Sequence, residues 1–262
     1  MVEPLADECP RCLGKGWVVV ADGGAGTARP CECRLQAMGP RLLEASGIPA
    51  QYRACSLESF RSSHPDPAAR DQLTRALAES RAYVEGFLRP DGRFGESGLI
   101  YVGPTGAGKT HLAAAVATAL IERYRVRCRF VEFTALVHEI QSTFSPNAGG
   151  SKGEILEPVM EAELLVLDEL GAQRPTPWVQ DLLYLIINTR YTERRPTIFT
   201  TNYRLAEATA ARPGAGEAVD TLAYRLPATL VSRLFEMAKP IQLDAVSDYR
   251  REVRNVSFRT DR

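Results

Sequence analysis

Apolar residues along this chain follow two alternating patterns: short continuous runs, and longer stretches in which they recur every three or four positions. The short runs predict strands at residues 99–102, 128–133, 164–167, 196–202 and 239–243. The periodic stretches predict helices at residues 109–124 and 134–144, a short one ending at 161, one beginning at 175–177, and one over 221–237. Strands that alternate with helices, and that are apolar enough to be covered on both faces, predict an α/β fold built on a parallel sheet.

The residues ahead of these units follow a different pattern. They predict a short strand at residues 17–20, a glycine-containing loop at 21–30, and helices at 34–46 and 71–88. The change of pattern divides the chain into a small module, residues 1–40, and a larger domain, residues 41–262. Within the larger domain, glycine-rich composition predicts loops at residues 145–153 and 205–220.

The junction between the strand at 99–102 and the helix that follows contains the first chemical motif. Its eight residues fit G-x-x-x-x-G-K-[ST], the phosphate-binding P-loop, and they are Gly103, Pro104, Thr105, Gly106, Ala107, Gly108, Lys109 and Thr110. The glycines let successive N–H groups face one anion, and the helix N-terminus adds positive charge. Lys109 is expected to reach the β- and γ-phosphates of ATP, and Thr110 to ligate Mg²⁺. A glycine turn that binds nothing is the alternative; the strand–loop–helix order disfavours it.

Other residues complete the candidate nucleotide site. His111 follows the P-loop directly and is counted among the nucleotide-binding residues. Upstream, Tyr52, Leu57 and Phe60 are spaced irregularly, and two interpretations are open for them. They cover the adenine ring, or they simply anchor the chain to the core.

Two acidic residues end the strand at 164–167. Asp168 is expected to hold the hydration shell of Mg²⁺ together with Thr110, and Glu169 to polarise the water that attacks the γ-phosphate. An acidic pair can also cap a helix or form a solvated turn, but its position one strand–helix unit after a P-loop favours chemistry. The next strand ends at Asn202, which is expected to lie beside the pair and to bond the attacking water or the γ-phosphate. A strand-terminating Asn turn is the alternative.

Composition excludes few classes of protein. The chain has 262 residues, and its 32 Lys and Arg residues balance its 32 Asp and Glu residues, so contact with DNA would need a local basic patch. The acidic N-terminus lacks the apolar centre of a signal peptide, and no apolar run approaches the roughly 20 residues of a membrane span. We therefore expect a cytoplasmic protein with reduced thiols and no membrane partner.

Four cysteines crowd the small module: Cys9, Cys12, Cys31 and Cys33. A C-x-x-C turn and a second close pair across a loop present four thiolates to one Zn²⁺. Because so short a segment cannot bury a core, a structural zinc would supply its folding energy, about 10–16 kcal/mol apparent. A pair of disulfides, disfavoured by the compartment, and an iron–sulfur cluster are the alternatives.

The motifs together resemble the AAA+ ATPases, and within them the branch of helicase loaders and transposition helpers, the DnaC/DnaI and IstB-type proteins. The resemblance covers roughly residues 46–251. It rests on Ser46-Gly47-Ile48-Pro49 with Tyr52-Arg53 and Phe60, the P-loop followed by His111-Leu112, Leu167-Asp168-Glu169-Leu170-Gly171, Arg190-Tyr191, Thr200-Thr201-Asn202, and Ser232-Arg233-Leu234 before Pro240-Ile241. It implies a three-layer sandwich with a parallel sheet. Too few residues follow Arg233 for the full lid domain that many AAA+ proteins have.

The resemblance also implies roles for single residues. Asn202 becomes the sensor, and Arg233 becomes the arginine finger that reaches the γ-phosphate of a neighbouring subunit. Such a finger is worth about 10³–10⁵ in rate, which implies self-association through shared ATP sites. From the sequence alone, Arg233 is a helical arginine suited to a surface ion pair. Arg190 is a second candidate at an inter-subunit edge, and Tyr249-Arg250-Arg251 resembles a terminal basic motif without an assigned role.

The implied function is an ATPase that loads a replicative DNA helicase onto single-stranded DNA, with ATP hydrolysis as an assembly switch. The helix at 134–144 and the loop at 145–153 are the expected DNA contacts, and the cysteine module is expected to dock on the helicase. That module favours a loader over the alternative, an IstB-like helper that delivers target DNA to a transposase. A P-loop kinase or GTPase, and a zinc adaptor with a vestigial ATP site, fit the motifs less well.

Overall fold

A five-stranded sheet forms the centre of the computed structural model, which describes residues 9–20, 27–89, 93–95, 98–144, 151–173, 176–205 and 221–249. Its strands, in spatial order, are β4 (Cys128–Glu132), β5 (Leu164–Asp168), β6 (Thr197–Thr201), β3 (Gly98–Val102) and β7 (Lys239–Gln242). All pairings between them are parallel. β3, β5 and β6 are buried along their whole length, which explains their continuous apolar sequence. The predicted α/β fold with a parallel sheet is confirmed.

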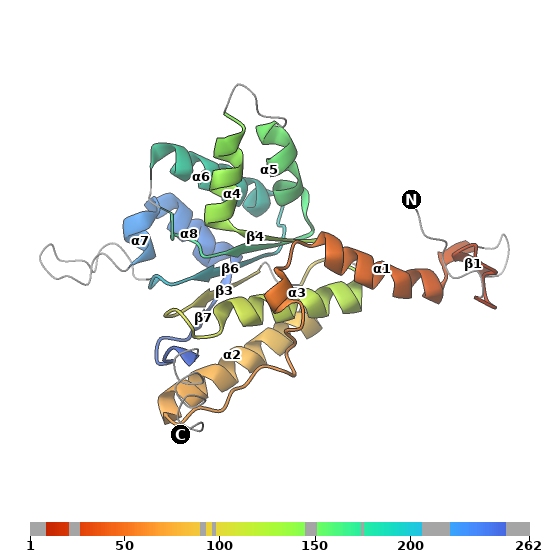
Figure 1. Ribbon diagram of the computed structural model, residues 1–262, viewed down its shortest axis with the longest axis horizontal. Helices are drawn as coiled ribbons and strands as arrows, with labels where there is room; N and C mark the ends of the chain where they lie inside the picture. Colours follow the sequence, from red (N-terminus) through yellow and green to blue (C-terminus); the bar gives the residue numbers. More distant parts are fainter. Residues whose placement is uncertain are drawn as a thin grey trace, which may run out of the picture.

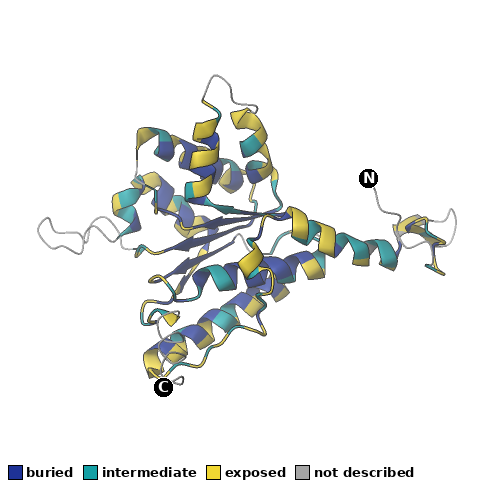
Figure 2. Ribbon diagram, viewed as in Figure 1, coloured by how far each residue is buried: buried dark blue, intermediate teal, exposed yellow. Residues whose placement is uncertain are grey.

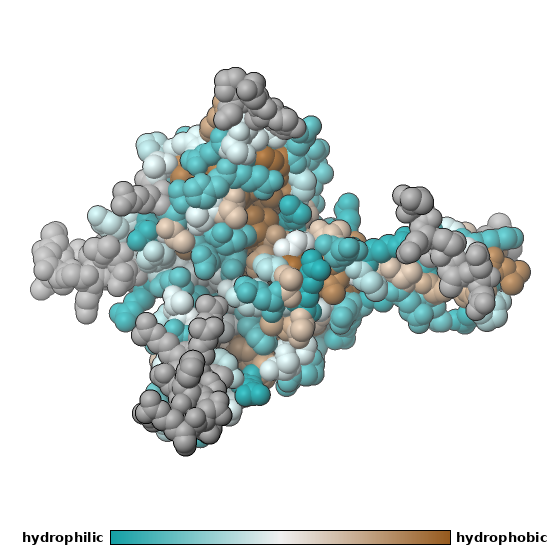
Figure 3. All heavy atoms as spheres, in the orientation of Figure 1, coloured by the Kyte–Doolittle hydropathy of each residue, from teal (hydrophilic) through white to brown (hydrophobic). Residues whose placement is uncertain are grey.

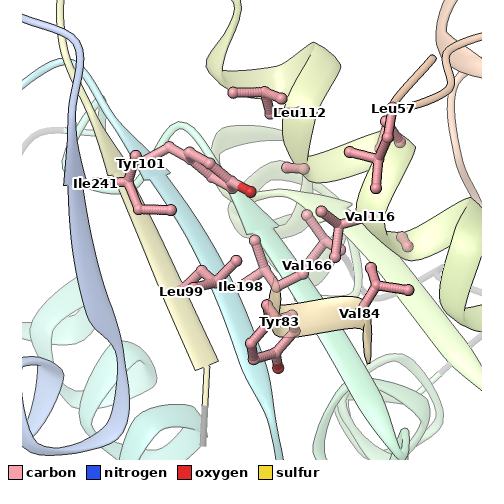
Figure 4. Close-up of a cluster of buried hydrophobic side chains, with 14 of the residues drawn as sticks. Leu57, Tyr83, Val84, Leu99, Tyr101, Leu112, Val116, Val166, Ile198 and Ile241 are labelled. Carbon is pink, nitrogen blue, oxygen red and sulfur yellow. The ribbon is translucent and has the colours of Figure 1, made fainter. Parts of the chain in front are cut away.

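Helices cover both faces of this sheet and produce three layers (Figure 1). One face is covered by α2 (Pro67–Gly86) and α3 (Lys109–Tyr124), and the other by α4 (Phe133–Ser142), α5 (Lys152–Glu161), α6 (Pro177–Thr192) and α8 (Ala228–Met237). Buried residues lie on the strands and on the inner faces of the helices (Figure 2). On the first face, Leu99, Val166 and Ile198 pack with Val84 of α2 and Val116 of α3 (Figure 4). No helix within the described ranges is both long enough and apolar enough to cross a bilayer.

The N-terminal module lies at the end of an arm formed by α1 (Glu32–Ala45), away from the sheet (Figure 1). In the module, β1 (Trp17–Val20) and β2 (Thr27–Pro30) pair as an antiparallel hairpin. The far end of α1 leads into the core, where the Phe130 N–H of β4 donates to the Ser46 carbonyl at 2.7 Å. The division proposed at residue 40 falls inside α1, so a continuous helix joins the module to the larger domain.

Several predicted boundaries differ from the observed ones. Residues 27–30 form β2, so the prediction of a loop across the whole of 21–30 is wrong there; pairing with β1 decides their conformation. α4 begins at Phe133 because the Glu132 carboxylate caps it, accepting from the N–H groups of Thr134 and Ala135 at 2.7 and 3.0 Å. α2 begins four residues earlier than predicted, behind the capping residue Asp66. The helix predicted over 221–237 is interrupted before Pro227, giving α7 (Leu222–Arg225) and α8. Of the predicted loop at 145–153, residues 145–150 lie outside the described residues, and the prediction is wrong at 152–153, which begin α5 because the Ser151 hydroxyl caps that helix by accepting the Glu154 N–H at 3.2 Å. Residues 206–220 of the predicted loop at 205–220 also lie outside the described residues.

Arg190 occupies the interior of the larger domain. Its side chain is fully buried on α6. Nη1 donates to three backbone carbonyls at the end of α5, those of Val159, Met160 and Ala162, at 2.8–3.2 Å. Nη2 donates to the Pro196 carbonyl at 2.7 Å and Nε to the Thr197 hydroxyl at 2.8 Å, both at the start of β6. The prediction that places Arg190 at an inter-subunit edge is therefore wrong, because every donor group is used inside the chain.

Replacing Arg190 with alanine is expected to lower the free energy of unfolding by about 3 kcal/mol or more. Each buried carbonyl that loses its donor costs about 1–3 kcal/mol, and several lose it at once. Arg190→Lys should recover little of the loss, since an ammonium cannot reproduce the planar guanidinium fork. Chemical denaturation followed by circular dichroism measures the effect, with Arg75→Ala, an exposed arginine on α2, as the matched control. Equal stability of the two alanine variants would contradict this role.

Candidate functional site

The P-loop connects β3 to α3 at the carboxyl edge of the sheet. At two of its positions the backbone conformation and the close neighbours require glycine. Gly106 has φ +83° and Gly108 has φ +91°, in the left-handed region that favours glycine. A Cβ on Gly106 would lie 2.0 Å from an Asp248 carboxylate oxygen, and one on Gly108 would lie 3.0 Å from the Phe60 ring. Lys109 Nζ donates to the carbonyls of Gly103 and Pro104 at 2.8 and 2.7 Å, so backbone groups of the P-loop position the lysine ammonium group.

Thr110 and Asp168 meet at the base of this loop, as the sequence predicts. The Thr110 hydroxyl lies 3.0 and 3.3 Å from the two carboxylate oxygens of Asp168. Burial raises the pKa of Asp168, and hydrogen bonds from Thr200 and Thr110 oppose that shift. A hydroxyl and a buried carboxylate are hard oxygen donors of the kind that Mg²⁺ takes, so this pair fits the ion.

Glu169 begins the turn after β5, and its side chain is exposed at the same edge. Its backbone has φ +59°, a left-handed conformation that is uncommon for a residue other than glycine. The Glu169 N–H donates to the Thr200 hydroxyl at 3.0 Å, and the Leu170 N–H donates to the Thr200 carbonyl at 2.8 Å. The turn that presents Glu169 to solvent is thus held by the end of β6.

Asn202 directly follows β6, and it too is exposed. β6 pairs in register with β3, so that Thr201 lies opposite Val102, and the Gly103 N–H donates to the Thr201 carbonyl at 3.3 Å. The P-loop, the acidic pair and Asn202 therefore emerge from three adjacent strands. Sequence reasoning predicted each of them but missed Thr200, whose hydroxyl contacts both acidic residues.

A cavity of about 250 Å³ opens beside the P-loop. Gly106, Ala107, Gly108 and His111 line one side. The other sides include residues 59–64 and 246–249, which meet here: the His64 ring lies 3.2 Å from the Ser247 hydroxyl, and Arg61 donates to the Tyr249 hydroxyl at 3.3 Å. These partners are more than 180 residues apart, and no local sequence signal predicts the pairing.

The cavity separates the two interpretations of the upstream apolar residues. Leu57 is buried in the core cluster beside α3, which makes it an anchor. Phe60 lines the cavity instead, with its ring 5.4 Å from the His111 ring in an edge-on arrangement. Burial lowers the pKa of His111, so an apolar ring and a neutral imidazole face the space beside the P-loop.

The four module cysteines come together in space. Their sulfur atoms all lie within 4.8 Å of one another, with Cys9 and Cys31 3.8 Å apart and Cys12 and Cys33 3.4 Å apart. Four sulfurs at a Zn–S distance of about 2.3 Å are about 3.8 Å apart in a tetrahedron, so the set fits one zinc ion. All four cysteines are unpaired in this structure, which favours metal ligation over the disulfide alternative, and a group of this size suits one ion.

Local hydrogen bonds also suit metal ligation. The Gly16 N–H donates to the Cys12 sulfur at 3.2 Å, and backbone groups of Cys12 and Arg11 lower the pKa of Cys9 to about 6. Neighbouring thiols, Cys12 foremost, raise the pKa of Cys33 to about 12. Four thiols at such distances cannot all ionise without a cation between them, because like charges disfavour one another.

Arg233 lies on α8 and packs against aromatic rings of α6. Its guanidinium carbon is 4.8 Å from the centre of the Tyr184 ring and 5.8 Å from that of Tyr191. Sequence reasoning alone suggests a surface ion pair, but within the described ranges Arg233 forms none. The Tyr184 and Tyr191 rings are both exposed, so the guanidinium lies in an aromatic part of the surface. Arg250 and Arg251 of the terminal basic motif lie outside the described residues.

Comparisons with known proteins agree on one group of relatives. A family model described as IstB-like ATP binding protein matches residues 95–227, more than half of the chain. The replicative helicase loader DnaC of Escherichia coli strain K12 is 31% identical over 169 residues, 64% of this chain and 64% of that protein. The chain thus spans less than two thirds of this relative's length. A crystal structure of the DnaC helicase loader superposes with TM-score 0.57 at 30% identity, over 74% of this chain and 99% of that one. A crystal structure of DnaI gives 0.55 at 26% identity, over 74% and 93%.

Proposed function

Since the chain belongs to the family of IstB-like ATP binding proteins, a DnaC/IstB-like group of AAA+ ATPases, we propose that it hydrolyses ATP in order to load a replicative DNA helicase onto single-stranded DNA. The family membership confirms the resemblance drawn from the sequence motifs. One observation carries the hydrolytic part of the proposal: the P-loop, Asp168, Glu169 and Asn202 emerge side by side from β3, β5 and β6.

Each residue of this edge has a task that its surroundings support. The P-loop amides and Lys109 bind the β- and γ-phosphates, while Phe60 and His111 line the space for the base. Thr110 and Asp168 hold Mg²⁺, which would neutralise charge on the phosphates. Glu169, exposed at the carboxyl edge, takes a proton from the attacking water. Asn202 orients that water or the γ-phosphate.

Self-association completes the proposed site. Arg233 packs on α6, in an exposed aromatic surface suited to contact with a second copy of the chain. Arg233→Ala is expected to lower ATP turnover by about 10³-fold in the assembled state, because the finger is supplied to the neighbouring subunit. ATP binding by each subunit should stay unchanged, since the arginine lies outside its own P-loop.

Mixing Arg233→Ala protein with a Lys109→Ala variant checks this prediction. Among the sites formed between one subunit of each variant, half would combine an intact P-loop with an intact arginine. Part of the turnover should therefore return. Arg75→Ala, an exposed arginine on α2, is the matched control and should retain full turnover. An Arg233→Ala variant as active as this control would rule out the finger.

An aromatic pair supports the DNA contact. Phe144, in the turn that follows α4, is exposed, and its ring lies 5.6 Å from the Trp178 ring at the start of α6 in a T-shaped arrangement. Exposed aromatic rings are platforms on which bases of single-stranded DNA stack. Phe144 directly precedes residues 145–153 in the sequence, the segment that the sequence analysis assigns to DNA contact, and Lys152 of that segment begins α5 and adds a positive charge.

The N-terminal module, residues 1–40, is the proposed docking element for the helicase. α1 holds it away from the sheet, and apolar side chains gather at the far end of this arm (Figure 3). Leu13 and Val19 are each 75% exposed, and Trp17 is exposed with the Arg34 guanidinium above its ring. Exposed apolar side chains on so small a module suit a protein partner. The second candidate, a transposition helper, is favoured by the family model that the chain matches.

Co-purification with the replicative helicase of the same host tests the proposal. The tagged full chain should retain the helicase, with and without ATP, and a Leu13→Ser/Val19→Ser variant should lose it while still hydrolysing ATP. Both substitutions are on exposed side chains, so the fold provides no reason for a general loss. Absence of any complex, together with capture of a transposase in its place, would reject the loader in favour of the transposition helper.

A further inference from the structure

One buried hydroxyl lies between the two acidic residues of the proposed ATP site. Thr200, on β6, is 1% exposed. Its Oγ1 donates to Asp168 Oδ1 at 2.5 Å and accepts the Glu169 N–H at 3.0 Å. A hydroxyl has one hydrogen to give and lone pairs that accept, so these two bonds are compatible and their direction is determined. The carboxylate of Asp168 therefore accepts two hydrogen bonds, one from the Thr110 hydroxyl of the P-loop and one from the Thr200 hydroxyl of the sheet.

The same segment of β6 also holds the turn that follows β5. The Leu170 N–H donates to the Thr200 carbonyl at 2.8 Å, and the Thr201 hydroxyl donates to the Leu170 carbonyl at 2.8 Å. These bonds stabilise the left-handed backbone of Glu169, which a residue other than glycine rarely adopts. Asn202 is the next residue of β6, so the turn and the proposed sensor share one short piece of backbone.

We propose that Thr200 is a positioning residue for the ATP site: its hydroxyl orients Asp168 toward the metal and fixes the turn that presents Glu169 to the attacking water. The proposal rests on the proposed ATPase function. Thr200 bonds to Asp168 and to the Glu169 N–H, and Thr201 bonds to the Leu170 carbonyl. A displacement of the end of β6 would therefore move Asp168, Glu169 and Asn202 together. Thr200 itself contacts no substrate atom in this scheme.

Three substitutions separate positioning from packing. Thr200→Val keeps the shape and removes the hydroxyl, whereas Thr200→Ser keeps the hydroxyl. Thr118→Val is the matched control, since Thr118 is a buried threonine of α3 whose hydroxyl has no hydrogen-bond partner among the described residues. Thermal unfolding verifies that each variant folds, and Thr200→Ala replaces Thr200→Val should the valine variant not fold.

Turnover and Mg²⁺-dependent ATP binding are then measured on the full chain. For Thr200→Val we expect turnover to fall roughly 10–100-fold, the usual range for removing a group that orients a metal ligand. The Mg²⁺ concentration at which ATP affinity rises should increase by a similar factor, while ATP affinity without Mg²⁺ stays unchanged. Thr200→Ser and Thr118→Val should match the wild type in both measurements.

The opposite outcome is equally clear. A Thr200→Val variant with wild-type turnover and wild-type Mg²⁺ dependence overturns the inference, and so does a Thr200→Ser variant that is as impaired as Thr200→Val. Failure of the proposed function gives a different result: the wild-type chain would hydrolyse no ATP. Mg²⁺-dependent nucleotide binding would still report on Thr200 in that case, because it depends on Asp168 and not on hydrolysis.

Discussion

Glu169→Gln is expected to reduce ATP turnover by about 10²–10⁴-fold, the range attributed to a positioned general base. Glutamine has nearly the same shape but cannot accept the proton of the attacking water. The turn is held through backbone groups and Thr200, so its geometry should survive the substitution. ATP affinity should remain within a few fold of the wild type, because the P-loop is unchanged. Phosphate release under steady-state conditions and binding of a fluorescent ATP analogue measure the two quantities.

A matched glutamate provides the control for this result. Glu157 is exposed on α5, outside the residues assigned to the ATP site, and Glu157→Gln should leave turnover unchanged. If Glu169→Gln hydrolyses ATP as fast as Glu157→Gln, another group accepts the proton. A combined loss of turnover and of ATP affinity would instead indicate that the turn had collapsed.

Cys12→Ser is expected to release the zinc from the module and to unfold it, while the larger domain remains folded. Structural zinc contributes about 10–16 kcal/mol of apparent folding energy, far more than so small a hairpin obtains from burial. Elemental analysis should find one zinc per wild-type chain and none in the variant. Limited proteolysis should then cleave the variant ahead of α1, and ATP turnover should persist, since the five-stranded sheet and the helices from α2 onward contain none of the four ligands.

Cys55→Ser is the control for metal content, because Cys55 is a free cysteine outside the cluster. It should retain the full zinc complement. Wild-type protein that contains iron in place of zinc, or no metal at all, would contradict the assignment of the cluster. Helicase capture by Cys12→Ser protein would separately contradict docking through a folded module.

Local sequence patterns were sufficient wherever one short segment decides its own structure. The continuous apolar run at residues 164–167 predicts a doubly covered strand, and the observed strand, Leu164–Asp168, is buried throughout. The P-loop motif predicts the turn between β3 and α3, where Gly106 and Gly108 have left-handed backbone angles that glycine favours. Segments whose conformation depends on a partner were predicted poorly. β2 is an example, because it forms by pairing with β1.

The sequence by itself determined the strand–helix alternation, the P-loop, the acidic pair after β5, Asn202 after β6 and the spacing of four cysteines. These depend on residue types within a few positions of one another, where periodicity and motif spacing are informative. Tertiary structure alone decided that Arg190 is an interior hydrogen-bond donor, that Thr200 links Asp168 to Glu169, and that His64 and Ser247 meet beside the P-loop. The physical reason is distance along the chain: each of these contacts joins residues from separate elements, and folding of the sheet is what brings them within hydrogen-bonding range.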